Sequence, residues 1–222
     1  MEKQIVLEGI SKIYGKDDAA VEALSDVNLD FSKGEFIGIT GTSGSGKTTL
    51  LRIIGLLDSA SKGRLLYEGK DMSAESDAAL SALRCEKIGY VFQDYHLIPE
   101  LTARENIMLP QVIAKKKGTK TVDGILKKLQ LDSRQAHYPS QMSGGQQQRV
   151  AIGRALVNEP ELLLCDEPTG NLDQKNSEEV MEILLQINEE MKTTVIIVTH
   201  DEKVAASCKR IIHIEDGKIV RA

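Results

Sequence analysis

The sequence predicts an α/β protein, because buried strands and amphipathic helices alternate along much of the chain. The runs 162–165 and 193–198 are almost continuously apolar, which is typical of strands buried on both faces of a parallel sheet. Between them, residues 176–191 place apolar side chains at helical spacing. A third apolar run, 35–40, leads through a glycine-rich loop into helical composition over 47–57. These segments follow one another as strand and helix, as the α/β class requires.

Segments near both ends of the chain predict antiparallel strands. Residues 3–14 and 23–31 have partly alternating apolar positions, and we expect both to be antiparallel strands. Residues 210–215 and 218–220 flank Asp216-Gly217, a two-residue signal that suits a type I′ hairpin turn. Further short strands are expected at 64–67 and 88–92.

The middle of the chain predicts helices. Residues 101–131 carry weak helical signals, which we expect Pro110 and Gly118 to break. A longer helix is expected over 143–157. Pro160 follows it and ends the helix by restricting the residue that precedes the proline.

Composition and charge exclude several classes of protein. The chain has 222 residues, of which 41% are hydrophobic and 27% are charged, so we expect a folded globular protein. The longest apolar runs, 53–57 and 195–198, are far shorter than the about 20 residues that a membrane span needs. A net charge of −5 weighs against a dedicated nucleic-acid binder, which needs a clustered positive field.

The first residues and the cysteines predict a cytosolic protein. The chain starts with charged residues and lacks the apolar stretch of a secretory signal. Cys85, Cys165 and Cys208 are odd in number and have no CxxC or Cys/His metal spacing. We expect them to be reduced thiols that serve as small apolar residues.

A glycine-rich loop carries the strongest functional signal. It matches G-x-x-x-x-G-K-[ST] between a predicted strand and a predicted helix, and it reads Gly41-Thr42-Ser43-Gly44-Ser45-Gly46-Lys47-Thr48, with Thr49 next. In such a loop, backbone N–H groups turn toward phosphate oxygens, and the helix N-terminus adds positive potential. Lys47 can neutralise phosphate charge, and the Thr48 hydroxyl can bind Mg²⁺. The loop therefore predicts a nucleoside-phosphate site.

Two acidic residues follow the apolar run 162–165. Because successive strand residues face opposite ways, Asp166 and Glu167 can serve different partners. We assign Asp166 to magnesium and Glu167 to an attacking water. The alternative is that the pair caps the next helix.

A second glycine-containing motif precedes the predicted helix over 143–157. It places a serine and two glycines where that helix begins, and it reads Met142-Ser143-Gly144-Gly145-Gln146-Gln147-Gln148-Arg149. Read alone, Ser143 is an N-cap residue. The helix start is also a second place where an anion is favoured.

The order and content of these motifs resemble the ATP-binding cassette (ABC) family over nearly the whole chain. Individual segments resemble the family's signature sequence (Met142 to Gln146), Walker B strand (162–167), Q-loop glutamine (Gln93), D-loop (170–173), switch histidine (His200) and adenine-stacking aromatic residue (Tyr14). Without this context, His200 would be interpreted as a structural histidine and Tyr14 as a half-buried strand residue.

The sequences of three segments resemble the MacB/LolD subfamily, whose ATPases partner FtsX-like permeases. These segments are 97–106, 144–155 and 167–173. The chain departs from the usual pattern at Met142, where Leu is common, at Thr42, where Pro is common, and at Cys165, where a smaller residue is common. Each is a small or apolar exchange, so hydrolysis is still expected.

The resemblance implies a fold in which one nucleotide-binding domain covers residues 1–222. Its core is a P-loop NTPase (RecA-like) domain with an N-terminal antiparallel β subdomain. An α-helical subdomain is expected to be inserted at approximately 94–158.

The resemblance also implies that two copies pack head to tail around two ATP molecules. Tyr14 would stack on adenine, and residues 41–49 would hold the phosphates. Mg²⁺ would be bound by Thr48, Gln93 and Asp166. Glu167 would orient and deprotonate the attacking water, and His200 would contact the γ-phosphate. Lys47 and Gln93 would also take part in catalysis. The opposite copy would contribute Ser143, Gly144, Gly145 and Gln146.

The implied function is ATP hydrolysis that drives an FtsX/MacB-like permease from the inner face of the cell membrane. The substrate, for example a peptide, lipoprotein, drug or haem, is not encoded here because the permease selects it. The alternative is a soluble ABC-type ATPase that acts on nucleic acid or on a cluster-assembly complex, which would carry a coiled-coil insertion or a basic face. The lysine run 115–117 is expected to be solvated, with lipid headgroups as the alternative contact.

Overall fold

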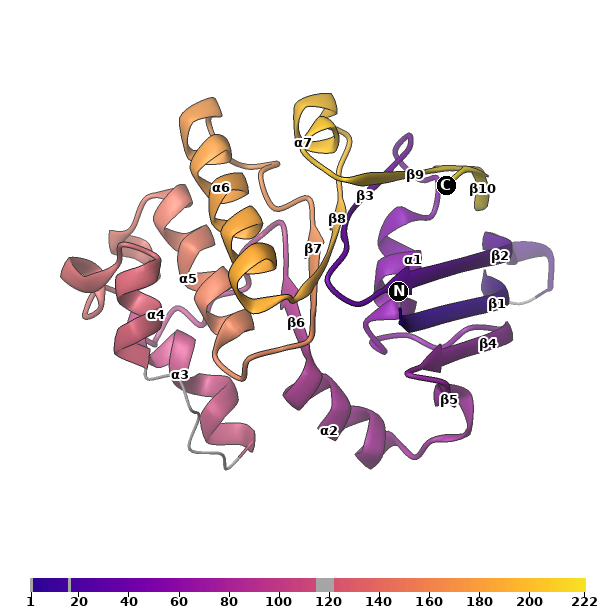
Figure 1. The fold of residues 1–222 in the computed structure, drawn as a ribbon, viewed down its shortest axis with the longest axis horizontal. Helices are drawn as coiled ribbons and strands as arrows, with labels where there is room; N and C mark the ends of the chain where they lie inside the picture. The colour runs from indigo at the N-terminus through magenta and orange to yellow at the C-terminus, as the bar shows by residue number, and fades with distance from the viewer. Residues whose placement is uncertain (1, 16, 115–121) are drawn as a thin grey trace. The chain divides into compact units, whose positions relative to one another are not determined.

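The computed structural model describes residues 2–15, 17–114 and 122–222, which divide into two compact units. Unit 1 comprises Met1–Ser81 and Thr194–Ala222, and unit 2 comprises Ala82–Thr193. Figure 1 shows the chain coloured by residue number. The lysine run 115–117 and Gly118 lie outside the described residues.

Unit 1 contains a four-stranded antiparallel sheet near the N-terminus (Figure 1). Its strand order is β2-β1-β4-β5, with β1 at Lys3–Tyr14, β2 at Val21–Ser32, β4 at Lys62–Tyr67 and β5 at Lys70–Asp71. The predicted antiparallel strands are therefore confirmed, and β1 pairs with both β2 and β4.

The second group of strands in unit 1 joins the two ends of the sequence. β3 (Phe36–Thr40) is parallel to β8 (Thr194–Val198) on one side and to β9 (Arg210–Glu215) on the other. All of β8 and the first four residues of β3 are buried, as their apolar sequences predict. β10 (Lys218–Arg221) closes a hairpin with β9.

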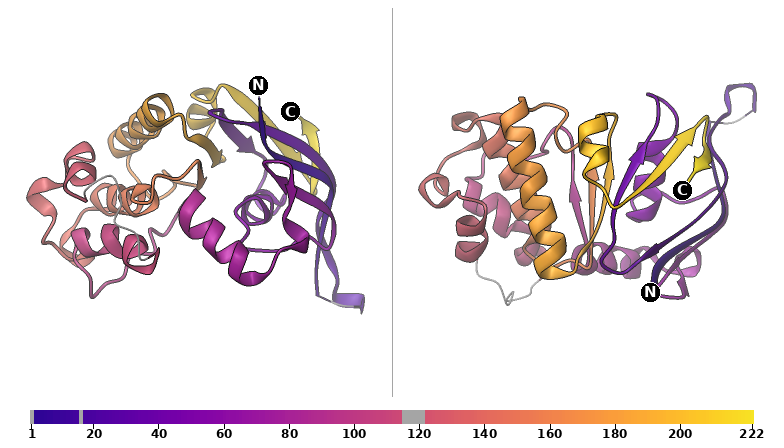
Figure 2. Two further views of the ribbon diagram at one scale, coloured as in Figure 1. Left: turned by 60° about the horizontal axis from the view of Figure 1, so that its bottom comes forward. Right: turned by 45° about the horizontal axis from the view of Figure 1, so that its top comes forward.

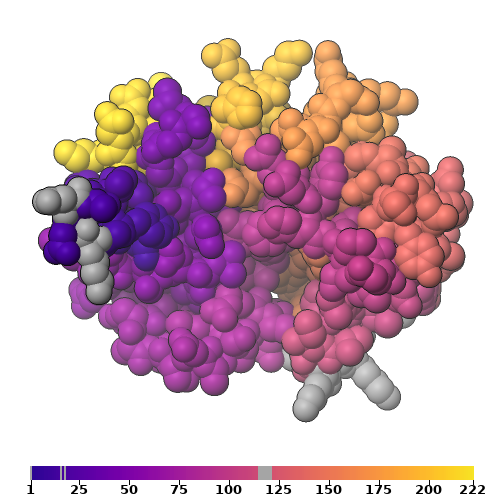
Figure 3. All heavy atoms as spheres, turned by 180° about the vertical axis from the view of Figure 1, so that it is seen from behind, coloured from indigo at the N-terminus to yellow at the C-terminus, as the bar shows by residue number. Residues whose placement is uncertain are grey.

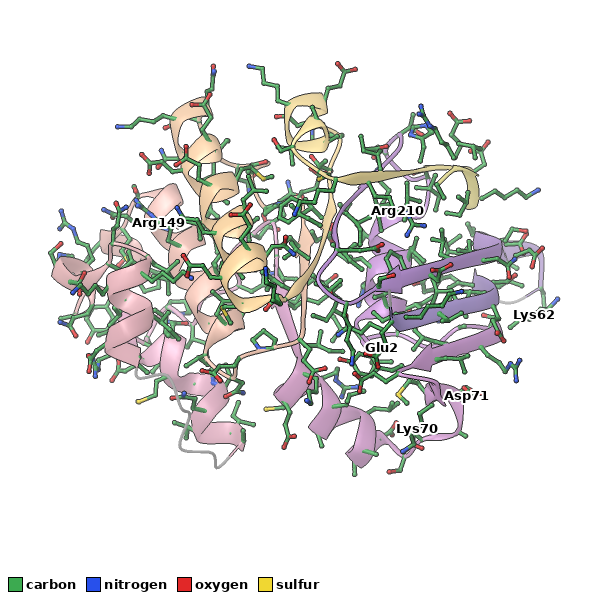
Figure 4. All side chains as sticks on the ribbon, viewed as in Figure 1. Glu2, Lys62, Lys70, Asp71, Arg149 and Arg210 are labelled. Atoms are coloured by element: carbon green, nitrogen blue, oxygen red, sulfur yellow. The ribbon has the colours of Figure 1, made fainter. Side chains whose placement is uncertain are left out.

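Two views show how the ends of the chain meet in unit 1. Yellow C-terminal strands lie beside indigo and purple N-terminal segments in Figure 2, and the space-filling view of Figure 3 shows the same grouping. Arg210, labelled in Figure 4, donates a 2.9 Å hydrogen bond from Nη1 to the carbonyl oxygen of Asp30. This bond ties β9 to the end of β2.

The helices of unit 1 are short. α1 spans Lys47–Ile54, shorter than the expected 47–57, because Leu56 adopts a left-handed backbone with φ of 57°. α7 (Glu202–Ala206) and the single 3-10 turns η1 (Asp17–Ala19) and η2 (Met72–Ala74) complete this unit. Five residues are too few to produce a periodic apolar pattern, so α7 was not expected from the sequence.

The described part of unit 2 contains one pair of parallel strands and several helices. β6 (Ile88–Val91) pairs with β7 (Leu162–Asp166). The helices are α3 (Ala103–Ala114), α4 (Val122–Lys128), α5 (Gly144–Leu156) and α6 (Gln174–Met191), with 3-10 turns η3 (Asp132–Arg134) and η4 (Pro139–Gln141). In Figure 4, Arg149 of α5 is labelled, and its Nη1 lies 3.6 Å from Glu179 Oε2 of α6.

Two features of the helical region differ from the sequence expectation. α2 (Asp77–Lys87) was not predicted, and none of its residues is buried. The predicted break at Pro110 is wrong, because α3 continues through it to Ala114. Proline removes one helical N–H donor, but the helix is anchored by buried Asn106 and Ile107 before it.

The described part of the segment between β6 and β7 contains helices and no strand. An α-helical subdomain is therefore present, while its predicted extent of about 94–158 stays a prediction. Among residues 2–15, 17–114 and 122–222, no helix combines the length and the hydropathy of a bilayer-spanning segment.

Close packing of α5 on β6 generates a first prediction. A Cβ at Gly89 would lie 2.6 Å from the carbonyl oxygen of Ala155, whereas a Cβ at Gly38 would lie 3.0 Å from the movable Cys208 Sγ. We expect Gly89→Ala to lower the free energy of unfolding by about 1–3 kcal/mol, as overpacking does, and Gly38→Ala to cost less. Urea denaturation measures both losses, and equal losses would contradict this account.

Candidate functional site

The glycine-rich loop of unit 1 connects β3 to α1 and is tightly enclosed by backbone. Gly41 and Gly46 have φ of 152° and 103°, which disfavour other residues. A Cβ at Gly41 would collide with the carbonyl oxygen of Ile214, and one at Gly46 with that of Ala23. Glycine at these two positions is therefore required by close backbone approach.

Lys47 brings a positive charge to the centre of this loop. Its Nζ donates hydrogen bonds to the carbonyl oxygens of Gly41 at 2.9 Å and Thr42 at 2.7 Å, and the residue is buried. Lys47 is also the first residue of α1, where the helix dipole is positive. Within the described chain, Ser45 Oγ is buried without a hydrogen-bond partner. Fixed positive potential and an unsatisfied buried hydroxyl both suit a bound phosphate.

The β9–β10 hairpin supports the same loop. Asp216 and Gly217 have φ of 43° and 75°, the two positive values that the predicted type I′ turn requires. The backbone N–H of Gly217 donates to the carbonyl oxygen of Ser45 at 3.0 Å, and its carbonyl accepts from the Ser25 N–H at 2.9 Å. The turn thus bridges β2 and the glycine-rich loop, a role that the sequence did not indicate.

His200 and Tyr14 are the other candidate residues of unit 1. The backbone N–H of Thr199 donates to the Ile39 carbonyl at 3.1 Å, so β8 ends beside the point where β3 enters the loop, and His200 follows. Tyr14 is the last residue of β1 and is 40% exposed. Its hydroxyl donates to Asp58 Oδ2 at 2.8 Å.

The remaining predicted residues of the glycine-rich loop lie at the surface or close to it. Thr42, Ser43, Gly44 and Thr48 are exposed, and Thr49 is half-buried.

The candidate residues of unit 2 gather at the carboxyl end of its parallel strands. Val91 of β6 is in register with Cys165 of β7, so Gln93 and the pair Asp166-Glu167 follow the same edge. Glu167 has a φ of 48°, in the left-handed region that non-glycine residues rarely adopt.

The loop after β7 holds the segment that contains Gln93. The Asn171 side chain donates from Nδ2 to the Gln93 carbonyl and to Asp94 Oδ1, both at 3.2 Å. Asp173 is the N-cap of α6 and accepts from the Asn176 N–H at 2.8 Å. The predicted Q-loop and D-loop segments are therefore in direct contact, which no local sequence pattern revealed.

Residues 95 and 96 form a second strained point after Gln93. Tyr95 and His96 have φ of 60° and 47°. Arg154 of α5 donates from Nη2 to the Tyr95 carbonyl at 2.7 Å and from Nη1 to the His96 carbonyl. Burial lowers the pKa of Arg154, and both ends of its guanidinium fork donate to these carbonyls. Sequence reasoning missed Arg154, because its partners lie nearly 60 residues away in the chain.

The start of α5 contains a complete capping box. Ser143 Oγ accepts from the Gln146 N–H at 3.3 Å, and Gln146 Oε1 accepts from the Ser143 N–H at 3.0 Å. A Cβ at Gly144 would lie 2.9 Å from Tyr95 Oη, and one at Gly145 would collide with Asn176. The motif thus has a structural role in its own chain, and Ser143 remains exposed.

The structure brings the candidate residues together in two groups. Unit 1 holds Tyr14, the loop 41–49 and His200, and unit 2 holds the groups around Gln93, Glu167 and Ser143. No cluster of three or more metal-binding side chains was found among the described residues.

The profile of a family described as ABC transporter matches residues 24–170, and the chain belongs to this family. It is an ATPase cassette of the MacB- and LolD-like kind. The lipoprotein-releasing system ATP-binding protein LolD of Geobacter metallireducens is 45% identical over 217 residues, which cover 95% of each chain. The macrolide export ATP-binding/permease protein MacB of Escherichia coli K12 is 46% identical over 218 residues.

The length of the match differs between these relatives. The chain spans about a third (34%) of the MacB protein but nearly all of LolD. Among solved structures, the dimeric post-hydrolysis state of the ATP-binding cassette MJ0796, bound to ADP and Pi, has a TM-score of 0.90 and 42% identity, covering 98% of this chain and 97% of that one. CbiO1 of Clostridium perfringens, part of the transporter complex CbiONQ, has a TM-score of 0.87 at 27% identity, covering 100% and 88%.

These findings confirm the predicted P-loop fold, the resemblance to MacB and LolD, and the ATPase class. The relatives described above are transporter components, so they support transport rather than action on nucleic acid or on a cluster-assembly complex.

The hairpin contact on the phosphate loop generates a second prediction. Gly69, in the β4–β5 turn, has a φ of 79° like Gly217, but a Cβ there would meet nothing within 4 Å. A Cβ at Gly217 would lie 2.8 Å from the Ala23 carbonyl oxygen. Both Ala variants should lose about 1–2 kcal/mol from the left-handed backbone. Only Gly217→Ala should also lower ATPase activity, by about tenfold or more, because it displaces the loop.

Steady-state phosphate release and thermal unfolding of both variants measure this difference. If Gly69→Ala lost as much activity as Gly217→Ala at equal stability, the hairpin would not support the loop.

Proposed function

We propose that two copies of this chain bind ATP and Mg²⁺ between them, and that ATP hydrolysis drives an FtsX/MacB-like permease. The observation that carries the proposal is the glycine-rich loop, which surrounds Lys47 at the start of α1 with backbone too close for side chains at Gly41 and Gly46. Such a loop stabilises phosphate through N–H groups, the helix dipole and a fixed ammonium group.

Each remaining site residue has one task in this proposal. Tyr14 stacks on the adenine base, and His200 contacts the γ-phosphate. Bound Mg²⁺ would neutralise phosphate charge, and we assign it to Thr48, Gln93 and Asp166. Carboxylate, hydroxyl and amide oxygens are the donors that Mg²⁺ prefers.

Glu167 is the proposed general base. It accepts a proton from water as the water oxygen attacks the γ-phosphorus, and the bond from that phosphorus to the bridging oxygen of ADP breaks. The products are ADP and inorganic phosphate. Glu167 lies directly after β7, with a left-handed backbone of φ 48°.

The second copy contributes the start of α5 to each site. Ser143, Gly144, Gly145 and Gln146 approach the γ-phosphate at the positive end of a 13-residue helix. ATP then favours the closed dimer, and loss of the γ-phosphate removes this preference. The dimeric structure of MJ0796 with ADP and Pi supports such an arrangement.

The cassette acts on its permease at the inner face of the cell membrane. The segment from Gln93 to Arg104 is the proposed contact with the permease, and its exposed residues are Gln93, Asp94, His96, Pro99 and Glu100. LolD relatives are named for lipoprotein release and MacB relatives for macrolide export, so we propose export or extraction of such a substrate. The permease selects the substrate.

A third prediction concerns Glu167. We expect Glu167→Gln to slow phosphate release by about 10²-fold or more, because the amide cannot take up the proton. ATP binding should persist, and ATP should hold the variant as a dimer in sedimentation. Glu189→Gln, an exposed change on α6, is the matched control. Turnover near that of the parent would remove Glu167 from the mechanism.

The same trapped variant tests the partner. Purified from native membranes with ATP and Mg²⁺, it should bring down a permease with a large extracytoplasmic domain, identified by mass spectrometry. Recovery of nucleic acid or of a soluble assembly complex would favour the alternative function.

A fourth prediction tests the shared sites. Lys47→Ala and Ser143→Arg should each abolish hydrolysis, because each breaks one half of both sites. A one-to-one mixture should recover activity, with about a quarter of the sites intact in a random symmetric dimer. Phosphate release from the mixture, compared with each variant alone, measures the recovery. No recovery would contradict sites built from two copies.

A further inference from the structure

A cluster of three side chains, Lys12, Tyr14 and Asp58, surrounds the end of β1. Asp58 uses both carboxylate oxygens in it. Oδ2 accepts from the Tyr14 hydroxyl at 2.8 Å, and Oδ1 accepts from Lys12 Nζ at 2.6 Å. Asp58 follows α1 by four residues, so the carboxylate links β1 to the helix that starts in the phosphate loop.

Lys12 holds the Tyr14 ring from a second direction. Its Nζ lies 4.9 Å from the ring centroid, which is within the range of a cation–π contact. The same ammonium donates to the Ser59 carbonyl at 2.7 Å, and Lys12 is buried. Lys12 thus occupies one face of the ring, while Tyr14 remains 40% exposed.

The position of Asp58 is itself fixed by backbone hydrogen bonds. Its N–H donates to the Arg52 carbonyl at 3.2 Å in the turn that ends α1. Ser61 returns the chain to β1, since its N–H donates to the Ser11 carbonyl at 2.8 Å and its Oγ accepts from the Ile13 N–H at 3.0 Å. The carboxylate is therefore presented by a short segment held at both ends.

Asp58 remains an anion at neutral pH. Burial alone would raise its pKa, but the hydrogen bonds from Lys12 and Tyr14 outweigh burial and lower the pKa below its ordinary value. The carboxylate therefore accepts both hydrogen bonds in its charged form, which makes them stronger than neutral ones.

We propose that Asp58 is a positioning residue that fixes the Tyr14 ring for stacking of the nucleotide base. The inference rests on the proposed function, in which Tyr14 stacks on adenine. Without Asp58, the exposed ring can turn among its rotamers, and binding must then order it at a cost in affinity. Because Asp58 follows α1, it also ties the base contact to the helix that begins at the phosphate loop.

The fifth prediction separates base contact from phosphate contact. Tyr14→Phe removes only the hydroxyl and keeps the Lys12–Asp58 ion pair, so the fold is retained. Asp58→Ala removes the acceptor. Each should raise the Kd for ATP by about threefold to tenfold, the cost of ordering one side chain. The Kd for inorganic tripolyphosphate, which has no base, should stay close to that of the parent protein.

Two further variants complete the test by calorimetry with Mg²⁺. The double variant Tyr14→Phe/Asp58→Ala should be no weaker than Asp58→Ala alone, because both single changes remove the Tyr14–Asp58 hydrogen bond. Asp58→Asn keeps an acceptor oxygen and should restore part of the affinity for ATP. Asp71→Ala, which removes a hydrogen-bonded aspartate elsewhere in unit 1, is the matched control.

The outcomes distinguish this inference from the proposed function. Tyr14→Ala removes the whole ring. If it weakens ATP but Tyr14→Phe and Asp58→Ala do not, stacking stands and positioning by Asp58 is wrong. If both of those variants weaken ATP and tripolyphosphate equally, Asp58 only supports the fold. If Tyr14→Ala leaves the ratio of the two affinities unchanged, base stacking itself is wrong.

Discussion

Backbone contact around the phosphate loop is the constraint on which the rest of unit 1 depends. The carbonyls of Ala23 and Ile214 reach the loop from strands almost 200 residues apart, at the two positions where only hydrogen fits. Backbone groups cannot rotate away as side chains can. The loop therefore keeps its shape only when β2, β3 and the β9–β10 hairpin are all in place. The position of Lys47 follows, because its ammonium is bound by carbonyls of that same loop.

Unit 2 is organised around a segment whose backbone conformation is strained, whereas unit 1 is organised around a loop that neighbouring backbone encloses. Tyr95 and His96 hold left-handed backbone conformations, and the surrounding side chains oppose their relaxation. Arg154 binds their two carbonyls from α5, and Asn171 binds the Gln93 carbonyl from the loop after β7. A movement of the α5 start or of that loop therefore changes the forces on this segment. In the proposed function the same segment contacts the permease, so strain here provides a physical route from ATP chemistry to the membrane partner.

Local patterns predicted the parts of the fold that depend on local physics. Apolar runs identified β7 and β8, and glycines that require positive φ identified the phosphate loop and the Asp216-Gly217 turn. α2 was not predicted, and none of its residues is buried. The predicted break at Pro110 is wrong because tertiary packing outweighs one lost hydrogen bond, so α3 continues through the proline. The contacts that position candidate residues could not be predicted. Asp58 with Tyr14, and Arg154 with Tyr95, are pairs 44 and 59 residues apart, and neither has a local signature.

The start of α5 shows why a structural role and a binding role need not compete. Ser143 and Gln146 satisfy each other's backbone N–H groups, as a capping box does in any helix. Capping fixes the first turn but leaves the helix dipole in place, so the positive potential at this end persists. The packing of Gly145 against Asn176 holds that turn to α6. A γ-phosphate from a second copy would therefore meet a helix end already in its final conformation, and closure would not have to order it.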